Sequence, residues 1–301
     1  MQTRVFKHIA IVGRSGKVSV QATVNELIKR LMPNYHLCVN AETAMLLAGE
    51  LNKQVQVLDN TALACCDMVI VVGGDGSMLE MAGLVAGTDT PILGVNRGRL
   101  GFLADIHPQA LHKVEAVLAG AYQVDRRFLL QMRVQNNGVV RYEEVALNDV
   151  VLHAGKSVHT IDFELSIDGQ RVYRQHADGL IVATPTGSTA YNLSAGGAIV
   201  HPSLAAICLT PMYPHTLSSR PLLVSDTSEI VLQVHKDNRT QPMVSPDGKV
   251  SVPLNADERL IITKYPHALT LLHPVGFDFY AACRTKLNWN SFADEFALTS
   301  S

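Results

Sequence analysis

The sequence predicts an α/β domain followed by a mostly β domain. In the first third, short apolar runs at residues 8–12, 35–39, 68–72 and 92–95 alternate with helical stretches, which is typical of a small doubly wound, Rossmann-like sheet. After residue 120 the pattern changes, and the turns Asn137-Gly138 and Asp168-Gly169 stand between alternating apolar residues, as in β-hairpins. We therefore expect an α/β domain over residues 1–122 and a β-rich domain over residues 123–275.

The composition favours a globular, cytoplasmic protein. The chain has 301 residues, of which 47% are hydrophobic, so it can fill a sizeable core. Its net charge of −2 provides no overall positive field, which argues against nucleic acid or a membrane surface as a partner. The first apolar run is also too short for a signal peptide or a membrane span. The cysteines are odd in number and form no C-x-x-C pair, which favours reduced thiols at Cys38, Cys65, Cys66, Cys208 and Cys283.

The remaining elements follow from periodicity and from helix-breaking residues. The first strand leads into a loop at residues 13–17 and a helix that ends at Met32, before Pro33. This loop is not a P-loop, because its glycines are too close together and Val18 stands where Ser or Thr should follow the lysine. Further helices are expected at residues 42–51 and 108–119, and further strands at residues 145–152, 180–183, 207–209, 229–234 and 260–263.

A glycine turn after the run Val69–Val72 is the first candidate site. Its three glycines, Gly73, Gly74 and Gly76, can bring bare main-chain N–H groups against a phosphate. We expect Ser77 to cap a helix through residue 86, whose positive dipole end would lie at the same place. A carboxylate here would repel an anion, so Asp75 should serve as a general base or as a partner of Mg²⁺. The alternative is that Gly-Gly-Asp-Gly is only a turn.

A second candidate segment, residues 96–103, follows the strand at residues 92–95. Gly98 and Gly101 allow close approach of the backbone to a ligand, and Arg97 and Arg99 can offset phosphate charge. The alternative is a surface loop with solvated arginines.

Polar residues also interrupt the predicted β domain. Asn148 and Asp149 stand inside an apolar strand, where an amide beside a carboxylate suits a base edge and the diol of a ribose. A β-bulge is the alternative. Residues 178–197 combine hydroxyls, glycines and Tyr191, which can bind the polar edges of a nucleotide and stack on a ring, although a hydroxyl-rich turn would contain the same residues. The histidines show no metal-ligand spacing such as H-E-x-x-H, so we expect no protein-built metal site.

In their order and in their amino-acid sequences, these segments resemble the NAD kinase family, which transfers a phosphoryl group from ATP to the adenosine-ribose 2′-hydroxyl of NAD. The matching blocks are residues 73–76, 96–103, 147–152, 178–197 and 214–221. Gly-Gly-Asp-Gly alone also occurs in lipid and sugar kinases, whereas the combination of blocks is specific.

The resemblance implies a site with Asp75 as general base and with Gly73, Gly74 and Gly76 at the phosphates, while Mg²⁺ arrives with ATP. It further implies a sandwich-like second domain, a C-terminal tail at residues 276–301 that packs back on the first domain, and a homodimer or homotetramer. By the same carry-over, the NAD-binding residues are Gly74, Asp75, Asn148, Asp149, His159, His176, Asp178, Thr189, Ala190, Tyr191, Asn192, Leu193, Ser194 and Lys249.

Two residues depart from the family pattern. Asp149 replaces a more usual Glu, so its carboxylate reaches less far. His176 stands where related enzymes often have Arg, which leaves the choice between NAD and NADH open. Two alternatives to an NAD kinase remain: a lipid or sugar kinase with the same glycine motif, and a non-catalytic NAD(P)-binding regulator.

Overall fold

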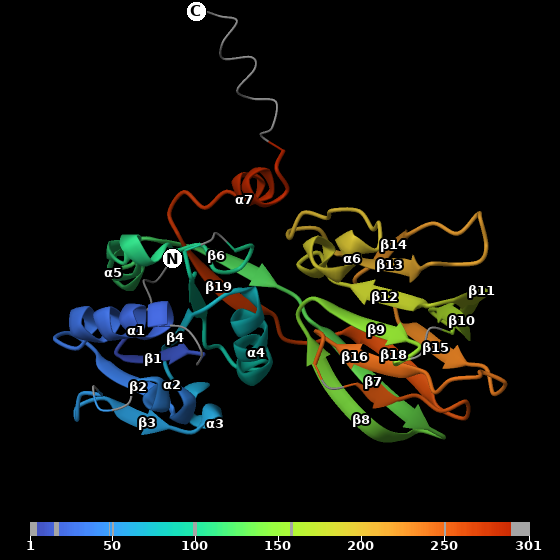
Figure 1. The fold of residues 1–301 in the computed structure, drawn as a ribbon, viewed down its shortest axis with the longest axis horizontal. Helices are drawn as coiled ribbons and strands as arrows, with labels where there is room; N and C mark the ends of the chain where they lie inside the picture. Colours follow the sequence, from blue (N-terminus) through green and yellow to red (C-terminus); the bar gives the residue numbers. More distant parts are fainter. Residues whose placement is uncertain are drawn as a thin grey trace, which may run out of the picture. The chain divides into compact units, whose positions relative to one another are not determined.

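The chain forms two compact units, whose elements are drawn in Figure 1. The computed structural model describes residues 5–14, 18–47, 49, 51–98, 101–156, 159–249 and 251–289. The described residues up to Arg126 and from Leu269 onwards make up unit 1, and Arg127–Ala268 make up unit 2. None of the described helices combines the length and the apolar character that a membrane span needs.

Unit 1 is built on a sheet whose described strands follow the order β3-β2-β1-β4-β5-β19-β6. The pairs from β3 through to β19 are all parallel. The chain builds this sheet outward from β1 in one direction and then from β4 in the other, so the doubly wound α/β prediction is confirmed. The strands are β1 (His8–Gly13), β2 (His36–Asn40), β3 (Gln56–Leu58), β4 (Met68–Val72), β5 (Ile92–Val95), β6 (Tyr122–Arg127) and β19 (Leu269–Pro274).

Helices of unit 1 cover the buried faces of this sheet. Apolar residues of α1 and α5 share one buried cluster with alternate strand residues such as Ile70 and Leu93. Since neighbouring strand residues point to opposite faces, Val69 and Val71 face the other side of the sheet. Helix α4 contacts both β4 and β5. The helices are α1 (Val18–Leu31), α2 (Ala41–Leu46), α3 (Asn60–Leu63), α4 (Asp75–Val85) and α5 (His112–Leu118), with the 3₁₀ turn η1 (Pro108–Ala110) before α5.

Helix α4 begins earlier than predicted. Gly74 is its N-cap residue, so Asp75 and Ser77 both lie in the first turn, and the prediction that Ser77 caps the helix is wrong. The reason is that the chain turns into the helix directly after β4. Gly73 permits this turn, because a Cβ there would lie 2.4 Å from Ser77 Oγ.

Two other helices are shorter than predicted. Helix α2 ends at Leu46, where residues 42–51 were expected, and Asn52 instead forms a turn by accepting a hydrogen bond from the Gln54 N–H. The segment expected to be helical over residues 108–119 divides into η1 and α5.

Unit 2 is a sandwich of two antiparallel sheets. The described strands have the orders β11-β10-β15-β18-β7-β8 and β14-β13-β12-β9-β16-β17. Both sheets contribute alternate residues, such as Phe163 and Leu180, to one buried core, so the mostly β, sandwich-like prediction is confirmed. The elements are β7 (Leu130–Asn136), β8 (Val139–Ala146), β9 (Asp149–His153), β10 (Ile161–Ile167), β11 (Gln170–Ala177), β12 (Gly179–Ala183), η2 (Gly187–Thr189), α6 (Tyr191–Ser194), β13 (Ala206–Met212), β14 (Leu222–Ser225), β15 (Ile230–Val234), β16 (Met243–Pro246), β17 (Val252–Pro253) and β18 (Arg259–Lys264).

Both predicted hairpin turns are present. Asn137 and Gly138 have φ of 48° and 82° between β7 and β8, and Asp168 and Gly169 have φ of 50° and 76° between β10 and β11. Positive φ at both central residues is the type I′ geometry that suits the twist of antiparallel strands. The single strand expected over residues 145–152 is wrong, because the pairing breaks between β8 and β9.

The C-terminal part of the chain returns to the first sheet. Strand β19 lies between β5 and β6, so β6 joins the described sheet through β19. Helix α7 (Phe279–Lys286) follows, with Asp278 as its N-cap. The sequence-based boundary at residue 275 groups β19 with the β-rich domain, whereas its hydrogen-bonding partners belong to unit 1.

Candidate active site

A small cavity lies at the carboxyl ends of β1 and β4. These neighbouring strands mark the point where the order of the sheet reverses, which is where doubly wound sheets bind ligands. The cavity has a volume of about 300 Å³. It is lined by Arg14, Val20, Val72, Gly73, Gly74, Gly76, Ser77 and Arg97.

The groups around this cavity favour an anion. Arg14 and Arg97 supply positive charge, and α4 directs its N-terminus with its free N–H groups to the same place. Arg97 packs against the glycine turn, since a Cβ on Gly74 would lie 3.3 Å from Arg97 Nη2. Two positive side chains beside a helix N-terminus and bare glycine backbone can hold a phosphate chain. Arg99, which was also expected to offset phosphate charge, lies outside the described residues, as do residues 15–17 of the first loop.

The carboxylate of Asp75 is held by three donors. The N–H groups of Phe102 and Leu103 donate to its Oδ2 at 3.2 Å and its Oδ1 at 3.1 Å. The Nζ of Lys286 donates to Oδ2 at 2.9 Å. Gly101 lets the turn at residues 101–104 lie this close, because a Cβ there would lie 2.3 Å from Asp75 Oδ1. A fixed carboxylate therefore lies in the sequence between two glycines that line the anion cavity, although Asp75 itself is not among the lining residues.

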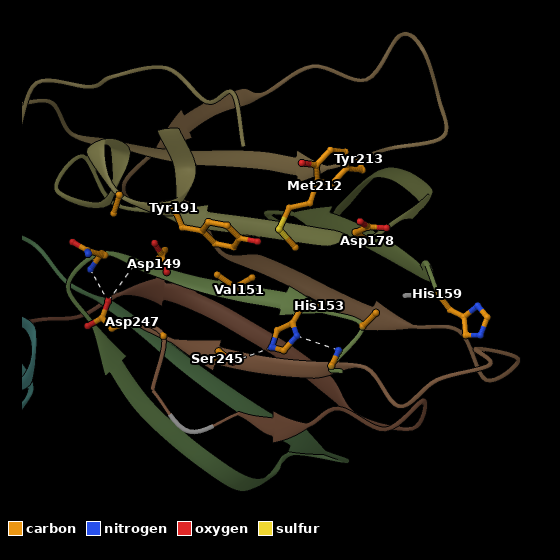
Figure 2. A pocket seen from close by; sticks show the side chains of 15 residues that line it. Asp149, Val151, His153, His159, Asp178, Tyr191, Met212, Tyr213, Ser245 and Asp247 are labelled. Atoms are coloured by element: carbon orange, nitrogen blue, oxygen red, sulfur yellow. Dashed lines mark hydrogen bonds between the residues drawn. The ribbon is translucent and has the colours of Figure 1, made fainter. Parts of the chain in front are cut away.

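Unit 2 contains a larger cavity, shown in Figure 2. Its volume is about 540 Å³. Asp149, Val151 and His153 reach it from one face of β9, while Val150 and Leu152 point into the sandwich core. The cavity therefore lies on the outer face of its sheet. It is lined by Asn148, Asp149, Val151, His153, Ala154, Gly155, His159, Asp178, Ala190, Tyr191, Met212, Tyr213, Ser245, Asp247 and Gly248.

Asp247 shapes the end of this cavity. Its Oδ2 accepts a hydrogen bond from the Leu147 N–H at 2.9 Å, and its Oδ1 accepts from the N–H groups of Asn148 at 2.7 Å and Asp149 at 3.2 Å. These N–H groups donate to a side chain instead of a neighbouring strand, which explains the break between β8 and β9. Asn148 and Asp149 are thereby turned towards the cavity.

Asp149 lies buried beside a second carboxylate. Burial raises its pKa to about 7, and the negative charge of Asp247 adds to the increase. Burial also raises the pKa of Asp247, although the three main-chain N–H groups and the nearby Lys249 charge oppose the rise. The Asp149 carboxyl can therefore exchange its proton near neutral pH, and as a carboxylate it can accept hydrogen bonds from hydroxyl groups.

Polar residues that the sequence did not single out also line the larger cavity. The Nε2 of His153 lies 2.9 Å from Ser245 Oγ, and its Nδ1 accepts a hydrogen bond from the Gly155 N–H at 3.1 Å. Burial lowers the pKa of His153, which favours the neutral ring that these contacts need. Ser245 and Asp247 belong to the segment Ser-Pro-Asp-Gly, whose Asp-Gly turn was the available sequence signal.

The predicted NAD-binding residues of unit 2 fall into two groups. Six of them line the larger cavity: Asn148, Asp149, His159, Asp178, Ala190 and Tyr191. The other six lie outside its lining: His176, Thr189, Asn192, Leu193, Ser194 and Lys249.

Contacts within the fold account for two residues of the second group. Asn192 is fully buried, donates to the Ser188 and Ala198 carbonyl oxygens, and accepts from Thr210 Oγ1 at 2.6 Å. Asn192 thus ties helix α6, which begins at Tyr191, to the residues around it. His176 contacts Asp162 rather than the cavity, with 3.3 Å between His176 Nδ1 and Asp162 Oδ1.

The described residues contain no group of three His, Cys, Asp or Glu side chains arranged to hold a metal ion. The sulfur atoms of Cys38 and Cys66 lie 3.2 Å apart in the interior, and all five cysteines are free thiols.

Comparison with known protein families accounts for both halves of the chain. Residues 9–122 match the ATP-NAD kinase N-terminal domain, and residues 147–273 match the ATP-NAD kinase C-terminal domain. The chain belongs to the NAD kinase family. The glycine turn and the anion cavity lie in the first matched segment, and the larger cavity lies in the second.

Curated relatives and solved structures agree with this family. The chain is 56% identical to the NAD kinase of Psychrobacter arcticus over 97% of this chain and 92% of that protein. It is 54% identical to the NAD kinase of Acinetobacter baylyi, with 96% and 94% coverage. Yeast NADH kinase complexed with NADH superposes with a TM-score of 0.86 at 26% identity, covering 95% of this chain and 89% of that one. An Archaeoglobus fulgidus NAD kinase in complex with ATP gives 0.70 at 26% identity, with 93% and 97% coverage.

Proposed function

We propose that this NAD kinase family member transfers the γ-phosphoryl group of ATP to the 2′-hydroxyl of the adenosine ribose of NAD, yielding NADP and ADP. The observation that carries the proposal is the fixed carboxylate of Asp75, which stands between Gly74 and Gly76 beside a cavity suited to phosphate. The names of the curated relatives support NAD as the acceptor. The Archaeoglobus fulgidus NAD kinase solved in complex with ATP supports ATP as the donor.

In the proposed reaction, Asp75 takes the proton of the 2′-hydroxyl while that oxygen bonds to the γ-phosphorus. The bond between the γ-phosphorus and the β–γ bridging oxygen breaks, and ADP leaves with the electron pair. Phosphoryl transfer depends on positioning and on charge stabilisation. The N–H groups at Gly74 and Gly76, together with Arg14 and Arg97, would supply these for the phosphate chain. Gly73 would line the site, while its own N–H donates to the Val95 carbonyl oxygen at 2.9 Å.

A divalent cation such as Mg²⁺ would arrive with ATP. The site fits such an ion, since the oxygens of a phosphate chain held in the anion cavity can provide its ligands. The phosphate oxygens would hold it, which leaves Asp75 free to act as the base. The ion would neutralise charge on the transferring phosphoryl group.

The larger cavity would hold the dinucleotide. Asn148 and Asp149 offer an amide and a carboxylate for a base edge and ribose hydroxyls, and Tyr191 offers a ring for stacking. His159, Asp178 and Ala190 line the same space. We retain Thr189, Asn192, Leu193, Ser194, His176 and Lys249 as neighbouring positions that would support the dinucleotide site.

The direct test is purified protein with ATP, Mg²⁺ and NAD, followed by a coupled assay for NADP. NADP should form with the wild-type protein, and Asp75→Asn should lose turnover while still binding NAD. Absence of NADP with the wild type would contradict the proposal. Phosphorylation of a lipid or a sugar instead would support the alternative kinase class, and NAD binding without turnover would support a regulator.

A second experiment tests the assignment of the larger cavity. Asn148→Ala should weaken NAD binding more than ATP binding, as measured by calorimetry with each ligand. Equal losses for the two ligands would count against Asn148 as a dinucleotide residue. A homodimer or homotetramer and a cytoplasmic location stay predictions, and sedimentation of the full chain would measure the first.

A further inference from the structure

The last turn of α7 brings a cation to Asp75. Helix α7 is anchored in unit 1 by the buried side chains of Phe279, Ala282 and Cys283. The rings of Phe279 and Phe102 lie 6.3 Å apart between centroids. From the end of this helix, Lys286 extends over Phe102, with Nζ 4.7 Å from the ring centroid and 2.9 Å from Asp75 Oδ2.

The two oxygens of Asp75 have different numbers of partners. Each carboxylate oxygen has two lone pairs. Oδ2 accepts from the Phe102 N–H and from Lys286, so both of its lone pairs are used. Within the described part of the chain, Oδ1 accepts from the Leu103 N–H alone and keeps one lone pair for a further donor.

We propose that Lys286 is a positioning residue for Asp75, which it holds by Oδ2 so that Oδ1 receives the proton of the acceptor hydroxyl. This inference rests on the function proposed above. In the step itself, the hydroxyl O–H bond breaks, its proton bonds to Oδ1, and the alkoxide electron pair bonds to the γ-phosphorus. Lys286 keeps its own proton throughout and makes no bond to substrate.

The energetics favour such a role over a purely structural one. The side chains of Lys286 and Asp75 are 29% and 30% exposed. Ion pairs with this degree of solvent access contribute little to stability. The aromatic ring below the ammonium and the helix behind it fix the direction of the lysine, which is what orientation of a carboxylate requires.

The test compares Lys286→Met with Arg284→Met in the full-length enzyme. Methionine keeps the apolar stem over Phe102 and removes the ammonium. Arg284 lies on the same helix and pairs with Asp278 at 3.0 Å, so its replacement is a matched loss of charge away from Asp75. We expect Lys286→Met to lower kcat about 10- to 100-fold with little change in the KM for ATP or NAD, and Arg284→Met to stay near wild type.

Three further measurements separate positioning from folding. Lys286→Arg, which keeps a donor cation, should recover part of kcat, and added ammonium ion should raise the turnover of Lys286→Met without affecting Arg284→Met. Thermal unfolding should place both methionine variants close to the wild type. If Lys286→Met proves unstable, Lys286→Gln carries the same comparison with a polar side chain.

The outcomes distinguish this proposal from the proposed function. An inactive wild-type protein would contradict the function itself. With an active wild type, unchanged kcat in Lys286→Met would overturn the positioning role alone. A raised KM for ATP at constant kcat would show that Lys286 binds phosphate. Turnover above the wild-type value would show that the lysine masks Asp75, and either result would also overturn the proposal.

Discussion

The carboxylate of Asp247 accepts a hydrogen bond of 2.7 Å from the main-chain N–H of Asn148. The two residues are 99 positions apart in the chain, so this contact joins the segment between β8 and β9 to the turn after β16. Asp247 accepts hydrogen bonds from three successive main-chain N–H groups in all. Strand pairing would otherwise provide the acceptors for these groups. The direction of Asn148 and Asp149 therefore depends on a side chain from a turn that is distant in the sequence.

Asp247→Asn should weaken NAD binding about tenfold more than ATP binding. The amide keeps one acceptor oxygen but turns an N–H₂ group towards a main-chain donor, and a hydrogen bond to a charged group contributes about 1.5 to 3 kcal/mol. Asparagine tolerates the φ of 48° at this position, so backbone strain is not added. Calorimetry with each ligand measures the difference.

Asp168→Asn is the matched control for this change. Asp168 has φ of 50°, precedes a glycine, and accepts the Glu229 N–H at 2.8 Å, but it lies in the β10–β11 hairpin away from the cavity lining. The substitution Asp168→Asn should leave the ratio of the NAD affinity to the ATP affinity unchanged. Equal effects of the two substitutions on NAD binding would contradict the role given to Asp247.

Stability should depend on pH through Asp149. Since burial and the charge of Asp247 raise its pKa from 3.8 to about 7, the folded protein keeps a proton that the unfolded chain releases between these values. The free energy of unfolding should therefore fall as pH rises from about 4 to 7, by at most about 4 kcal/mol. Urea unfolding of the wild type and Asp149→Asn at several pH values measures this, because the asparagine cannot titrate.

The same titration should appear in ligand binding. A carboxylate accepts hydrogen bonds from ribose hydroxyls at both oxygens, so NAD affinity should increase as pH rises through about 7 in the wild type. Asp149→Asn should lack this increase. A pH dependence that survives in the variant would assign the titration to another group.

Gly101→Ala should slow the reaction without unfolding the protein. Its new Cβ would lie 2.3 Å from Asp75 Oδ1, and the carboxylate would have to move. Displacement of a catalytic group by about 1 Å can cost on the order of 100-fold in rate, so we expect kcat to fall 10- to 100-fold. Steady-state kinetics and thermal unfolding give the two readouts.

Gly76→Ala is the comparison within the same site. A Cβ there meets nothing within 4 Å, and alanine favours a helix by up to about 1 kcal/mol, so the folded state should become more stable. If phosphate contacts this backbone, the KM for ATP should rise while kcat changes less than in Gly101→Ala. A large loss of kcat in Gly76→Ala alone would contradict this division of roles.

His273→Gln should destabilise unit 1 by about 3 kcal/mol, the cost of breaking a buried ion pair. His273 is buried and stacks on Phe277, with Nδ1 3.1 Å from Asp105 and Nε2 3.4 Å from Asp125. Burial lowers its pKa, but the two carboxylates outweigh burial and raise it above 6.5. The contact with Asp105 is a hydrogen bond at 3.1 Å, whereas the contact with Asp125 is longer, so we assign Asp105 the larger part of the increase in pKa.

The sign of this pH effect follows from the raised pKa. The stabilising contribution of His273 is complete below pH 6.5 and is lost as pH rises through the folded-state pKa. The advantage of the wild type over His273→Gln should therefore shrink above pH 6.5 in urea unfolding. His112→Gln, on the exposed surface of α5, should differ from wild type by less than about 0.5 kcal/mol. A difference that stays constant from pH 6 to 9 would contradict a charged His273.

Local patterns in the sequence predicted much of unit 1 and the hairpins of unit 2. The β-branched run before Gly73 reads as a buried strand, and Asn137-Gly138 permits a single turn type, so both were predictable from neighbouring residues. The return of β19 was not, because Leu269–Pro274 is an apolar strand that carries no local signal for the sheet it joins.

Non-local contacts also limited prediction of the site. Unusual polarity in an apolar segment or a recognisable sequence motif singled out Asp75, Asn148 and Tyr191. Asp247 and Lys286 act on residues about 100 and 211 positions away, and their own neighbours in the sequence give no hint of these partners. The early start of α4 was not predicted, because a serine after glycines is a typical N-cap residue. Only the path of the backbone shows that Gly74 is the N-cap.

The position of β19 in the sheet has a consequence for synthesis on the ribosome. A growing chain that has emerged only to residue 268 contains β1 to β5 but lacks the strand that joins β6 to them. Unit 1 can then complete its sheet only after unit 2 has been translated. The contact between Asp75 and Lys286 forms later still, so truncated products that end before α7 would lack it however well their earlier parts fold.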